Sequence, residues 1–285
     1  MNDAWRALLA CPACHGALQH DGACGGCSER YDLTGSAPSL VPSRWSSALE
    51  GEGGGRWREA MEGLAAWRVR RPRRPGASGP SAVDPRIVAL LGRSGLRGTV
   101  VDVGGKDGAK ASVMPAAVER YLAVDPGADG QPRGVRGGLE ALVVRGVGEA
   151  LPLRDGSVDG VFSTAALDYF LDPEGGVREL ARVLRPGGVL ALLVTTHPPA
   201  VARAREREGR LARALASLGG PARREVGLGG ALALAWDAAR ARRREHTRYL
   251  GEGEVLGWLR ARFAAVDVAR EVGAYSVVLS VVARR

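Results

Sequence analysis

The chain has 285 residues, of which 45% are hydrophobic and 25% are charged, and its formal net charge is +9. This composition indicates a globular protein with room for one large α/β domain and a small accessory module. No stretch approaches the roughly 20 apolar residues of a membrane span, and Asp3 and Arg6 interrupt the apolar start of the chain. We therefore expect a cytoplasmic protein with no membrane partner and no signal peptide.

The positive charge comes almost wholly from arginine, because Lys106 and Lys110 are the only lysines. A basic protein attracts phosphate polymers, which keeps RNA among the candidate partners. Arginine in place of lysine, together with much alanine and glycine, also reflects a GC-rich genome. The net charge alone therefore identifies no partner.

Four cysteines form two C-x-x-C knuckles in the run CPACHGALQHDGACGGC. Clustered cysteines in a chain without a secretion signal favour metal ligation over disulfides. Four thiolates suit a structural Zn²⁺ with a closed tetrahedral shell, and an iron–sulfur centre or a redox dithiol pair are the alternatives. We predict a zinc module over residues 1–42, with these ligands: Cys11, Cys14, Cys24 and Cys27.

Residues 43–83 are predicted to be a linker. Its middle, RWREAMEGLAAWRVR, has the pattern of a short helix, and its end, RPRRPGASGP, holds prolines and glycines that forbid regular structure. The run WRVRRPRRP is either a phosphate-binding arm or a solvated linker, and we favour the linker.

From Asp84 onward the pattern alternates helices with short buried strands. Asp84 is placed as the N-cap of a helix over 85–93 that has proline at its first position. Short apolar runs, the first two ended by acids, indicate parallel strands. The predicted strands are 99–103, 121–124, 142–144, 158–162, 189–195, 266–269 and 276–283. The further predicted helices are 174–184, a broken arginine-rich region over about 198–245, and 254–263.

These elements predict an α/β domain over residues 84–285. Its core is a doubly wound, mostly parallel, seven-stranded Rossmann-like sheet, preceded by the small zinc ribbon.

The first strand runs into a glycine-rich turn, VVDVGGKDG, which we interpret as a strand–loop–helix unit that docks a cofactor. Glycines there let the backbone approach a ligand. Asp125, at the end of the next strand, can accept hydrogen bonds from ribose hydroxyls. Asp102 stands before the first glycine, where it would repel a pyrophosphate but could orient an amino group. The pattern therefore favours a nucleoside with a charged amino group over a dinucleotide.

Over residues 84–285 the chain resembles the class I S-adenosylmethionine-dependent methyltransferases, in particular their quinone-biosynthesis-like group. The landmarks of that family occur in order: VVDVGGKDG, YLAVDP, GVGEALPLRDGSVDGVFSTAALDYFLDP, RELARVLRPGGVLALLV and HTRYLGEGEVLGWLRARF. The resemblance implies a methyltransferase that uses S-adenosyl-L-methionine.

By this resemblance, Gly104, Gly105 and Gly108 would border the methionine moiety of the cofactor, and Asp102 would face its amino group. The chain departs from the family at Lys106, where the family has a glycine. A lysine there could bond the cofactor's carboxylate, or it could obstruct the close approach of the backbone.

On the nucleoside side, the resemblance implies that Asp125 holds the ribose diol and that the backbone of Gly148 and Glu149 flanks the adenine. Val147 stands where the family often has an acid, which removes an acceptor for the adenine amino group. Both departures keep a further hypothesis open, a scaffold protein with impaired cofactor binding.

Methyl transfer needs a general base only when the acceptor is protonated and weakly nucleophilic. Asp168 and Tyr169 follow the fourth strand, where an acceptor would approach, and His246 is a base candidate near neutral pH. Each has a structural alternative, because Asp168 could cap a helix, Tyr169 could pack and His246 could order a loop. The fourth strand lacks the D/N-P-P-Y box that grips planar amino groups, which disfavours adenine amines and glutamine amides as acceptors.

The N-terminal run over 11–42 resembles the short zinc ribbon of the activators of tRNA and protein methyltransferases. That resemblance implies protein docking or acceptor recognition through the ribbon. An RNA acceptor (an rRNA or tRNA base) is favoured by the ribbon and by the arginine-rich segments. A small molecule is favoured by the quinone-type catalytic half and by the lack of interleaved aromatics for base stacking. We favour the small molecule.

Overall fold

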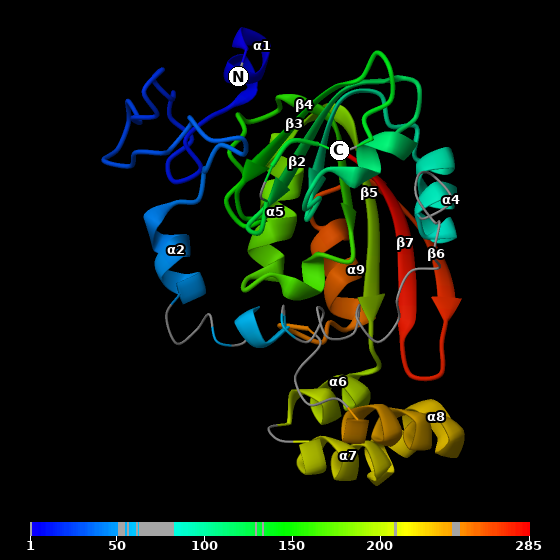
Figure 1. Cartoon of the computed structure of the whole chain (residues 1–285). Helices are drawn as coiled ribbons and strands as arrows, with labels where there is room; N and C mark the ends of the chain where they lie inside the picture. The colour runs from blue at the N-terminus through cyan, green and yellow to red at the C-terminus, as the bar shows by residue number, and fades with distance from the viewer. Residues whose placement is uncertain are drawn as a thin grey trace.

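The computed structural model describes residues 2–50, 55, 57–60, 62, 83–128, 130–132, 134–207, 210–240 and 246–285. Its centre is a seven-stranded sheet of order β3-β2-β1-β4-β5-β7-β6 (Figure 1). The predicted α/β fold with a mostly parallel sheet is confirmed. Within the described residues, we find no helix with the length and apolar character that crossing a bilayer requires.

Five parallel strands carry the first part of the sheet, and their central residues are apolar because both faces of the sheet are covered. Their bounds are β1 Gly98–Val103, β2 Val118–Asp125, β3 Glu140–Arg145, β4 Val158–Thr164 and β5 Leu184–Thr196. The last two strands are β6 (Ala265–Val272) and β7 (Val277–Arg284), and β7 lies antiparallel between β5 and β6. The strand predicted over 276–283 is thus present as β7.

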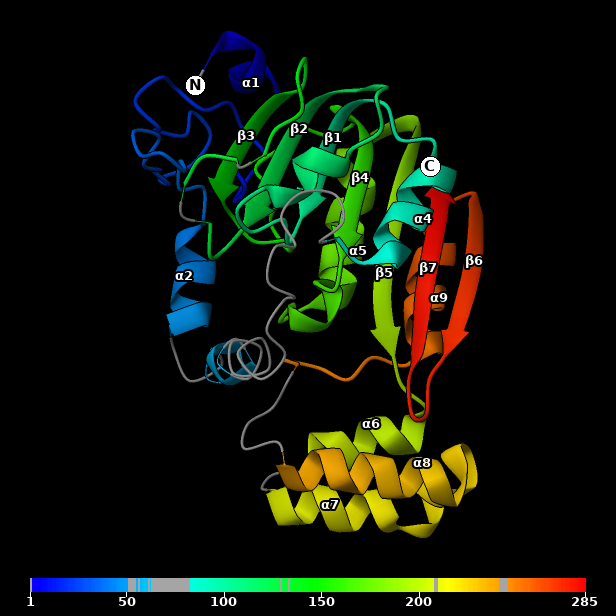
Figure 2. The same ribbon diagram turned by 45° about the vertical axis from the view of Figure 1, so that its right-hand side comes forward.

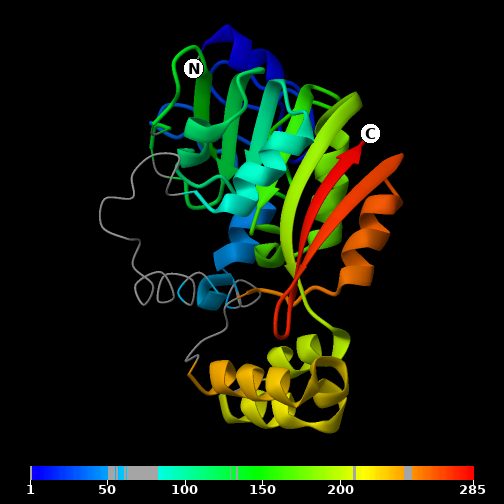
Figure 3. The same ribbon diagram turned by 90° about the vertical axis from the view of Figure 1, so that its right-hand side faces the viewer.

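Helices cover both faces of the sheet (Figure 3). One face carries α5 (Pro173–Val183) and α9 (Glu252–Arg260), and the other carries α4 (Pro85–Ser94). As predicted, Asp84 caps α4, because its side chain accepts a hydrogen bond from the backbone N–H of Arg86.

The helix predicted after the glycine loop is present only as a short 3₁₀ helix. The loop leads into a 3₁₀ helix, η3 (Ala109–Val113), and Pro115 follows shortly after it. Too few residues separate Gly108 from β2 for an α-helix to form several turns and return to the sheet. The loop must therefore hold any ligand through its own backbone and nearby side chains, without a helix N-terminus behind it.

The broken helical region forms a lobe beyond the carboxyl end of β5 (Figures 1 and 2). It consists of α6 (Pro199–Glu206), α7 (Arg210–Leu218) and α8 (Gly220–Arg240). The region is broken, as predicted, and one break lies inside α8, where Gly227 has φ 69°.

The cysteine module packs against the β3 side of the sheet. It starts with α1 (Asp3–Leu8) and leads into α2 (Ser43–Glu50). The backbone of Leu40 donates to the carbonyl of Arg145 at 2.8 Å, and the N–H of Arg145 donates to Pro38 at 2.8 Å, so the module extends the edge of β3. Its buried side chains share one core with the sheet face under α5: Trp5, Leu9, Cys11, Tyr31 and Leu40.

The predicted boundaries of the linker stay a prediction. Helix α2 falls inside it, whereas most of its predicted short helix and the whole of RPRRPGASGP lie outside the described residues.

Candidate functional site

A cavity of about 390 Å³ lies at the carboxyl ends of the parallel strands. The turns that follow β1, β2, β3 and β4 all contribute to its wall, because parallel strands end at the same edge of a sheet. The lining residues from these turns are Gly104, Lys106, Asp125, Pro126, Gly127, Val147, Gly148, Glu149, Ala165 and Ala166. Four residues predicted to bind a cofactor are thus brought together here: Gly104, Asp125, Gly148 and Glu149.

Two of the glycines are required by their surroundings. Gly104 has φ 79°, and a Cβ at this position would lie 2.3 Å from the Cβ of Ala166. A Cβ at Gly148 would lie 2.0 Å from the ring of Phe170. Any side chain at either position would collide with the opposite wall, so the backbone itself forms the surface of the cavity.

Asp125 closes β2 and presents its carboxylate to the cavity. The backbone N–H of Lys106 donates to Oδ2 at 3.1 Å, and the N–H of Gly127 donates to Oδ1 at 2.7 Å. Burial raises the pKa of this carboxyl, and the two N–H donors oppose that effect. The carboxylate therefore shapes the glycine turn and remains at the cavity wall.

Asp102 lies behind the glycine turn, outside the cavity wall. Its side chain is fully buried, and both carboxylate oxygens accept hydrogen bonds at 3.0 Å from Nζ of Lys110. The hydroxyl of Tyr121 also donates to it. An ammonium group of the chain itself thus neutralises the acid that we predict to face the cofactor's amino group, and that predicted role stays a prediction.

The other loop residues lie as follows. Gly105 and Gly108 support the turn without lining the cavity, and a Cβ at Gly105 would lie 2.9 Å from Ala123. Lys106 adopts a left-handed φ of 49°, and its exposed side chain borders the cavity. Val147 is buried in the wall.

The side chain of Glu149 binds the backbone of the two residues that precede α5. Its Oε1 accepts from the backbone N–H of Leu171 at 2.7 Å and of Asp172 at 3.4 Å. Burial raises its pKa to about 7, and the N–H donors only partly oppose this. The side chain therefore fixes the cavity wall, and near neutral pH it is partly protonated.

The segment after the cysteine module covers the cavity. Trp45 and Leu49 of α2 and the nearby Trp57 all line it. The indole N–H of Trp45 is buried and has no hydrogen-bond partner among the described residues, so it can donate to a bound molecule. These side chains add apolar and aromatic surface to this part of the cavity wall.

A second group of residues lies beside the first cavity. Asp168 belongs to the 3₁₀ helix η4 (Leu167–Tyr169), and its Oδ2 lies 2.6 Å from Nδ1 of His246. Tyr169 lines the first cavity, and its ring centroid is 5.3 Å from that of His246. The structure therefore brings together all three candidates for the chemical step.

Two residues that the sequence analysis missed complete this group. The ring centroid of His197 is 6.3 Å from His246, and that of Tyr249 is 5.4 Å from it. His197 and Tyr249 line a second, wider cavity of about 1200 Å³ between the end of β5, α6 and the segment before α9. The signal for His197 is its position directly after β5, at the edge of the sheet where ligands bind.

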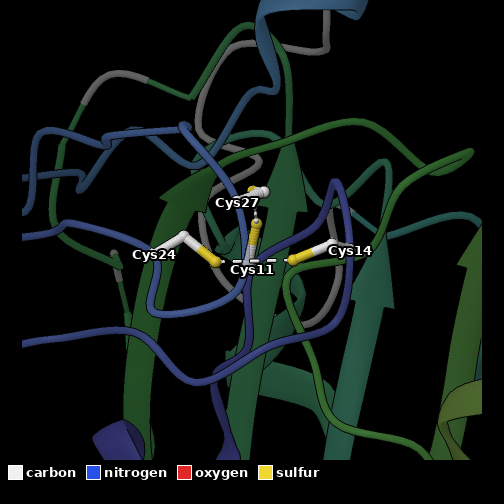
Figure 4. A group of neighbouring side chains, drawn as sticks. All are labelled: Cys11, Cys14, Cys24 and Cys27. Atoms are coloured by element: carbon white, nitrogen blue, oxygen red, sulfur yellow. Dashed lines mark hydrogen bonds between the residues drawn. The ribbon is translucent and has the colours of Figure 1, made fainter.

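The four cysteines converge in the N-terminal module (Figure 4). Their sulfur atoms all lie within 4.8 Å of one another. The Sγ–Sγ distances of 3.4 Å (Cys14–Cys24) and 3.7 Å (Cys11–Cys27) are much longer than a disulfide bond of about 2.05 Å. They are close to the edge of about 3.8 Å of a tetrahedron with Zn–S bonds of about 2.3 Å. The donor set fits a closed tetrahedral metal site.

Neighbouring groups shift the pKa values of the cysteines in opposite directions, down for Cys24 and up for Cys14 and Cys27. Burial alone would raise the pKa of Cys24, but the N–H of Gly26 and the other cysteines outweigh it and lower the pKa to about 7. The hydroxyl of Tyr31 lies 3.2 Å from Sγ of Cys11, in the shared core. Such contacts orient and stabilise charged sulfur ligands.

Comparison with known proteins finds a family that matches the parallel part of the sheet. Residues 101–192, which span β1 to β5 and the wall of the first cavity, match the family model described as "Methyltransferase domain". This part of the chain is therefore similar to a methyltransferase domain. The match covers the glycine turn, Asp125 and the strand before Asp168, and it does not extend to the cysteine module or to His246.

Curated relatives match the same part of the chain. An uncharacterized methyltransferase of Mycobacteroides abscessus is 39% identical over 113 residues, which are 38% of this chain and 42% of the relative. An uncharacterized methyltransferase of Mycobacterium sp. (strain KMS) is 38% identical over 101 residues, which are 34% of this chain and 38% of the relative. The chain thus spans less than half the length of these relatives.

Among solved structures, the geranyl diphosphate C-methyltransferase of Streptomyces coelicolor A3(2) is similar, with a TM-score of 0.47 and 12% identity over 70% of this chain and 78% of that one. A similarity of this size supports no conclusion about activity or substrate.

Proposed function

We propose that the chain is a methyltransferase that transfers the methyl group of S-adenosyl-L-methionine to a small-molecule acceptor. The observation that carries the proposal is the first cavity, where Gly104, Asp125 and Gly148 meet at the carboxyl ends of the strands. The similarity to a methyltransferase domain over the same residues supports it.

The residues of the cavity fit such a cofactor. The turn at Gly104 leaves space that a Cβ would fill, and the carboxylate of Asp125 can accept from a ribose diol. Trp45 adds an aromatic surface and an N–H donor above it. The side chain of Lys106 borders the cavity without filling it, since a volume of about 390 Å³ remains. This speaks against the scaffold hypothesis.

S-adenosyl-L-methionine, when bound, supplies a methyl group on a positively charged sulfur. The task of the protein is then to hold the acceptor in line with that methyl group and to exclude water, which together provide much of the acceleration of a displacement reaction. The cover formed by Trp45 and Leu49 serves the second purpose.

A small molecule is the acceptor that the described residues favour. The wall of the second cavity, which includes His197 and Tyr249, mixes apolar groups with charged side chains. The basic run WRVRRPRRP and much of the segment 238–248, which support an RNA acceptor, lie outside the described residues. RNA therefore stays the alternative, and it has a clear signature in salt-dependent binding.

We also propose that the four cysteines bind a structural Zn²⁺. The module is too small to hold itself together by a core of its own, so the metal would supply much of its folding free energy. Through α2, the ribbon would then keep the cover of the first cavity in place.

The function is tested with methyl-labelled S-adenosyl-L-methionine and a cell extract separated into small-molecule and RNA fractions. We expect the label in the small-molecule fraction, and we expect none with Gly104→Ala. Label in the RNA fraction alone would establish the RNA alternative. An absence of label in both, with no cofactor binding, would establish the scaffold.

A further inference from the structure

The pair formed by Asp168 and His246 lies next to residues that line the two cavities. Tyr169, which lines the first cavity, contacts His246 on one side, and His197 and Tyr249, which line the second, lie on the other. The lining of both cavities thus includes aromatic side chains that pack around His246.

Backbone hydrogen bonds fix this arrangement before any ligand binds. The N–H of Arg248 donates to the carbonyl of Asp168 at 3.1 Å, and the hydroxyl of Thr247 donates to the carbonyl of Tyr169 at 3.0 Å. The N–H of His197 donates to the carbonyl of Leu250 at 2.8 Å. The segment 246–250 is thus tied to η4 on one side and to the end of β5 on the other, which preorganises the histidine.

The buried groups have the properties of a proton-transfer site. Asp168 is 3% exposed, and its Oδ1 has no hydrogen-bond partner among the described residues. A buried carboxylate that binds Nδ1 of a histidine fixes the tautomer and stabilises the imidazolium that forms when Nε2 takes up a proton. His197 is 7% exposed, and its Nδ1 is likewise without a partner among the described residues, so it can bond an acceptor in the second cavity.

The groups around the pair disfavour a positive charge on His197. Burial, His246 and Arg205 of α6, in that order, lower the pKa of His197 to about 3, although Asp168 opposes them. His197 is therefore neutral at physiological pH. Arg248, on the segment that carries His246, lies 3.7 Å from Glu254, and Arg205 lies 3.9 Å from Asp237, so acids offset both positive charges. Among the described residues, the groups recorded against His246 include the carboxylate of Asp168, the neutral imidazole of His197 and the rings of Tyr169 and Tyr249.

We propose that Asp168 and His246 form a general-base pair and that the acceptor is a hydroxyl compound of the phenol type, methylated on oxygen. The inference rests on the proposed methyl transfer. The acceptor O–H bond breaks and its proton moves to Nε2 of His246. The oxygen forms the new bond to the methyl carbon, the C–S bond breaks, and its electron pair stays on the sulfur. The proton later leaves His246 for water, so that one proton is released for each methyl ether formed.

Other acceptors fit this site less well. A carboxylate is already ionised at neutral pH. A thiol has a pKa only slightly above neutral pH and forms a thiolate easily, so neither acceptor needs a buried acid–histidine pair. An amine reacts in its neutral form, in which the attacking lone pair is already free, so it does not need a base at that step. A hydroxyl is protonated at neutral pH and weakly nucleophilic, which is the case where a base contributes most.

The test uses three phenols of rising acidity (phenol, 4-chlorophenol and 4-nitrophenol), with thiophenol and benzylamine as other classes of acceptor. Methyl transfer is measured from labelled S-adenosyl-L-methionine with the full chain, His246→Gln, Asp168→Asn and the control His20→Gln, whose side chain is exposed in the cysteine module. The binding of S-adenosylhomocysteine is titrated for each protein. This measurement separates a failure of the proposed function from a failure of the base.

We expect His246→Gln to lower kcat/KM with phenol by about 100-fold or more, and the loss to shrink steadily toward 4-nitrophenol, which ionises without help. Asp168→Asn shows the same trend. Cofactor affinity is unchanged in both variants, and His20→Gln behaves as the parent protein. In the parent, the rate with phenol levels off as pH rises and His246 loses its proton, whereas in His246→Gln it continues to rise with the ionisation of phenol.

Three outcomes would overturn the inference although the cofactor binds normally. They are an equal loss with all phenols, transfer to thiophenol or benzylamine but to none of the phenols, and no transfer to any of these acceptors. A parent protein that does not bind the cofactor would overturn the proposed function itself.

Discussion

The two cavities of this molecule are built in different ways. The wall of the first consists of backbone turns that follow consecutive strands, and its glycines and Asp125 lie in short continuous motifs. The pair beside the second cavity joins Asp168 after β4 with His246, far along the chain, and His197 after β5 adds to it. A turn is encoded locally and can be predicted, whereas a cluster from three distant segments appears only once the chain is folded.

The largest effect is expected at the turn itself. Gly104→Ala should abolish cofactor binding and lower the melting temperature, because a left-handed φ costs about 1–2 kcal/mol without glycine and the new Cβ meets Ala166. Gly92→Ala in α4 is the control, since a Cβ there contacts nothing within 4 Å. Titration calorimetry and thermal unfolding check both. Normal cofactor binding by Gly104→Ala would mean that the turn does not touch the ligand.

The next effect tests whether the cover of the first cavity depends on the cysteine module. Cys24→Ser should lose the single bound zinc ion, open residues 1–42 to proteolysis and weaken cofactor binding through α2. The sheet should stay folded, as judged by circular dichroism.

The control for this variant is Ser28→Ala, which changes an exposed residue of the same module. A full zinc content in Cys24→Ser would contradict the four-cysteine site. An unchanged cofactor affinity after loss of the metal would separate the module from the cavity.

A moderate effect is expected from the cover alone. Trp45→Ala should weaken cofactor binding by about tenfold, through the loss of aromatic contact area and of an N–H donor. Trp236→Ala on the exposed surface of α8 should leave binding unchanged. Equal affinities in the two variants would show that α2 does not contact the cofactor.

The smallest effect concerns pH. The raised pKa of Glu149, about 7, lies above the usual value near 4.5, so the folded state binds its proton more tightly than the unfolded state does. Stability should therefore fall as pH rises from about 5 to 7, where the unfolded chain has already lost this proton.

Glu149→Gln keeps an acceptor for Leu171 and should remove this slope. Thermal unfolding across that pH range measures it, with Glu119→Gln on the surface as the control. An identical slope in the parent and in Glu149→Gln would assign the pH dependence to another group.

Much of the sheet was predictable, because each strand is an apolar run that ends in polar or turn residues. The absence of an α-helix directly after the glycine loop was not predictable. The path from Gly108 to β2 is short, and this becomes evident only with the sheet in place. The ion pair between Lys110 and Asp102 was equally hidden, because η3 brings the lysine back under the turn.

The cover of the first cavity escaped prediction for another reason. Its aromatic residues belong to a segment whose composition predicts a linker. Only packing against the β3 edge places Trp45 over the cavity.

The central claim is that Asp125 and the glycine turn bind an adenosyl cofactor, and calorimetric titration with S-adenosylhomocysteine tests it most directly. We predict saturable binding to the parent protein, a loss of about 10- to 100-fold in affinity for Asp125→Asn, as expected for hydrogen bonds to a charged group, and no change for Glu119→Gln on the same strand. The absence of binding to the parent at millimolar ligand, or equal affinity in Asp125→Asn, would contradict the account.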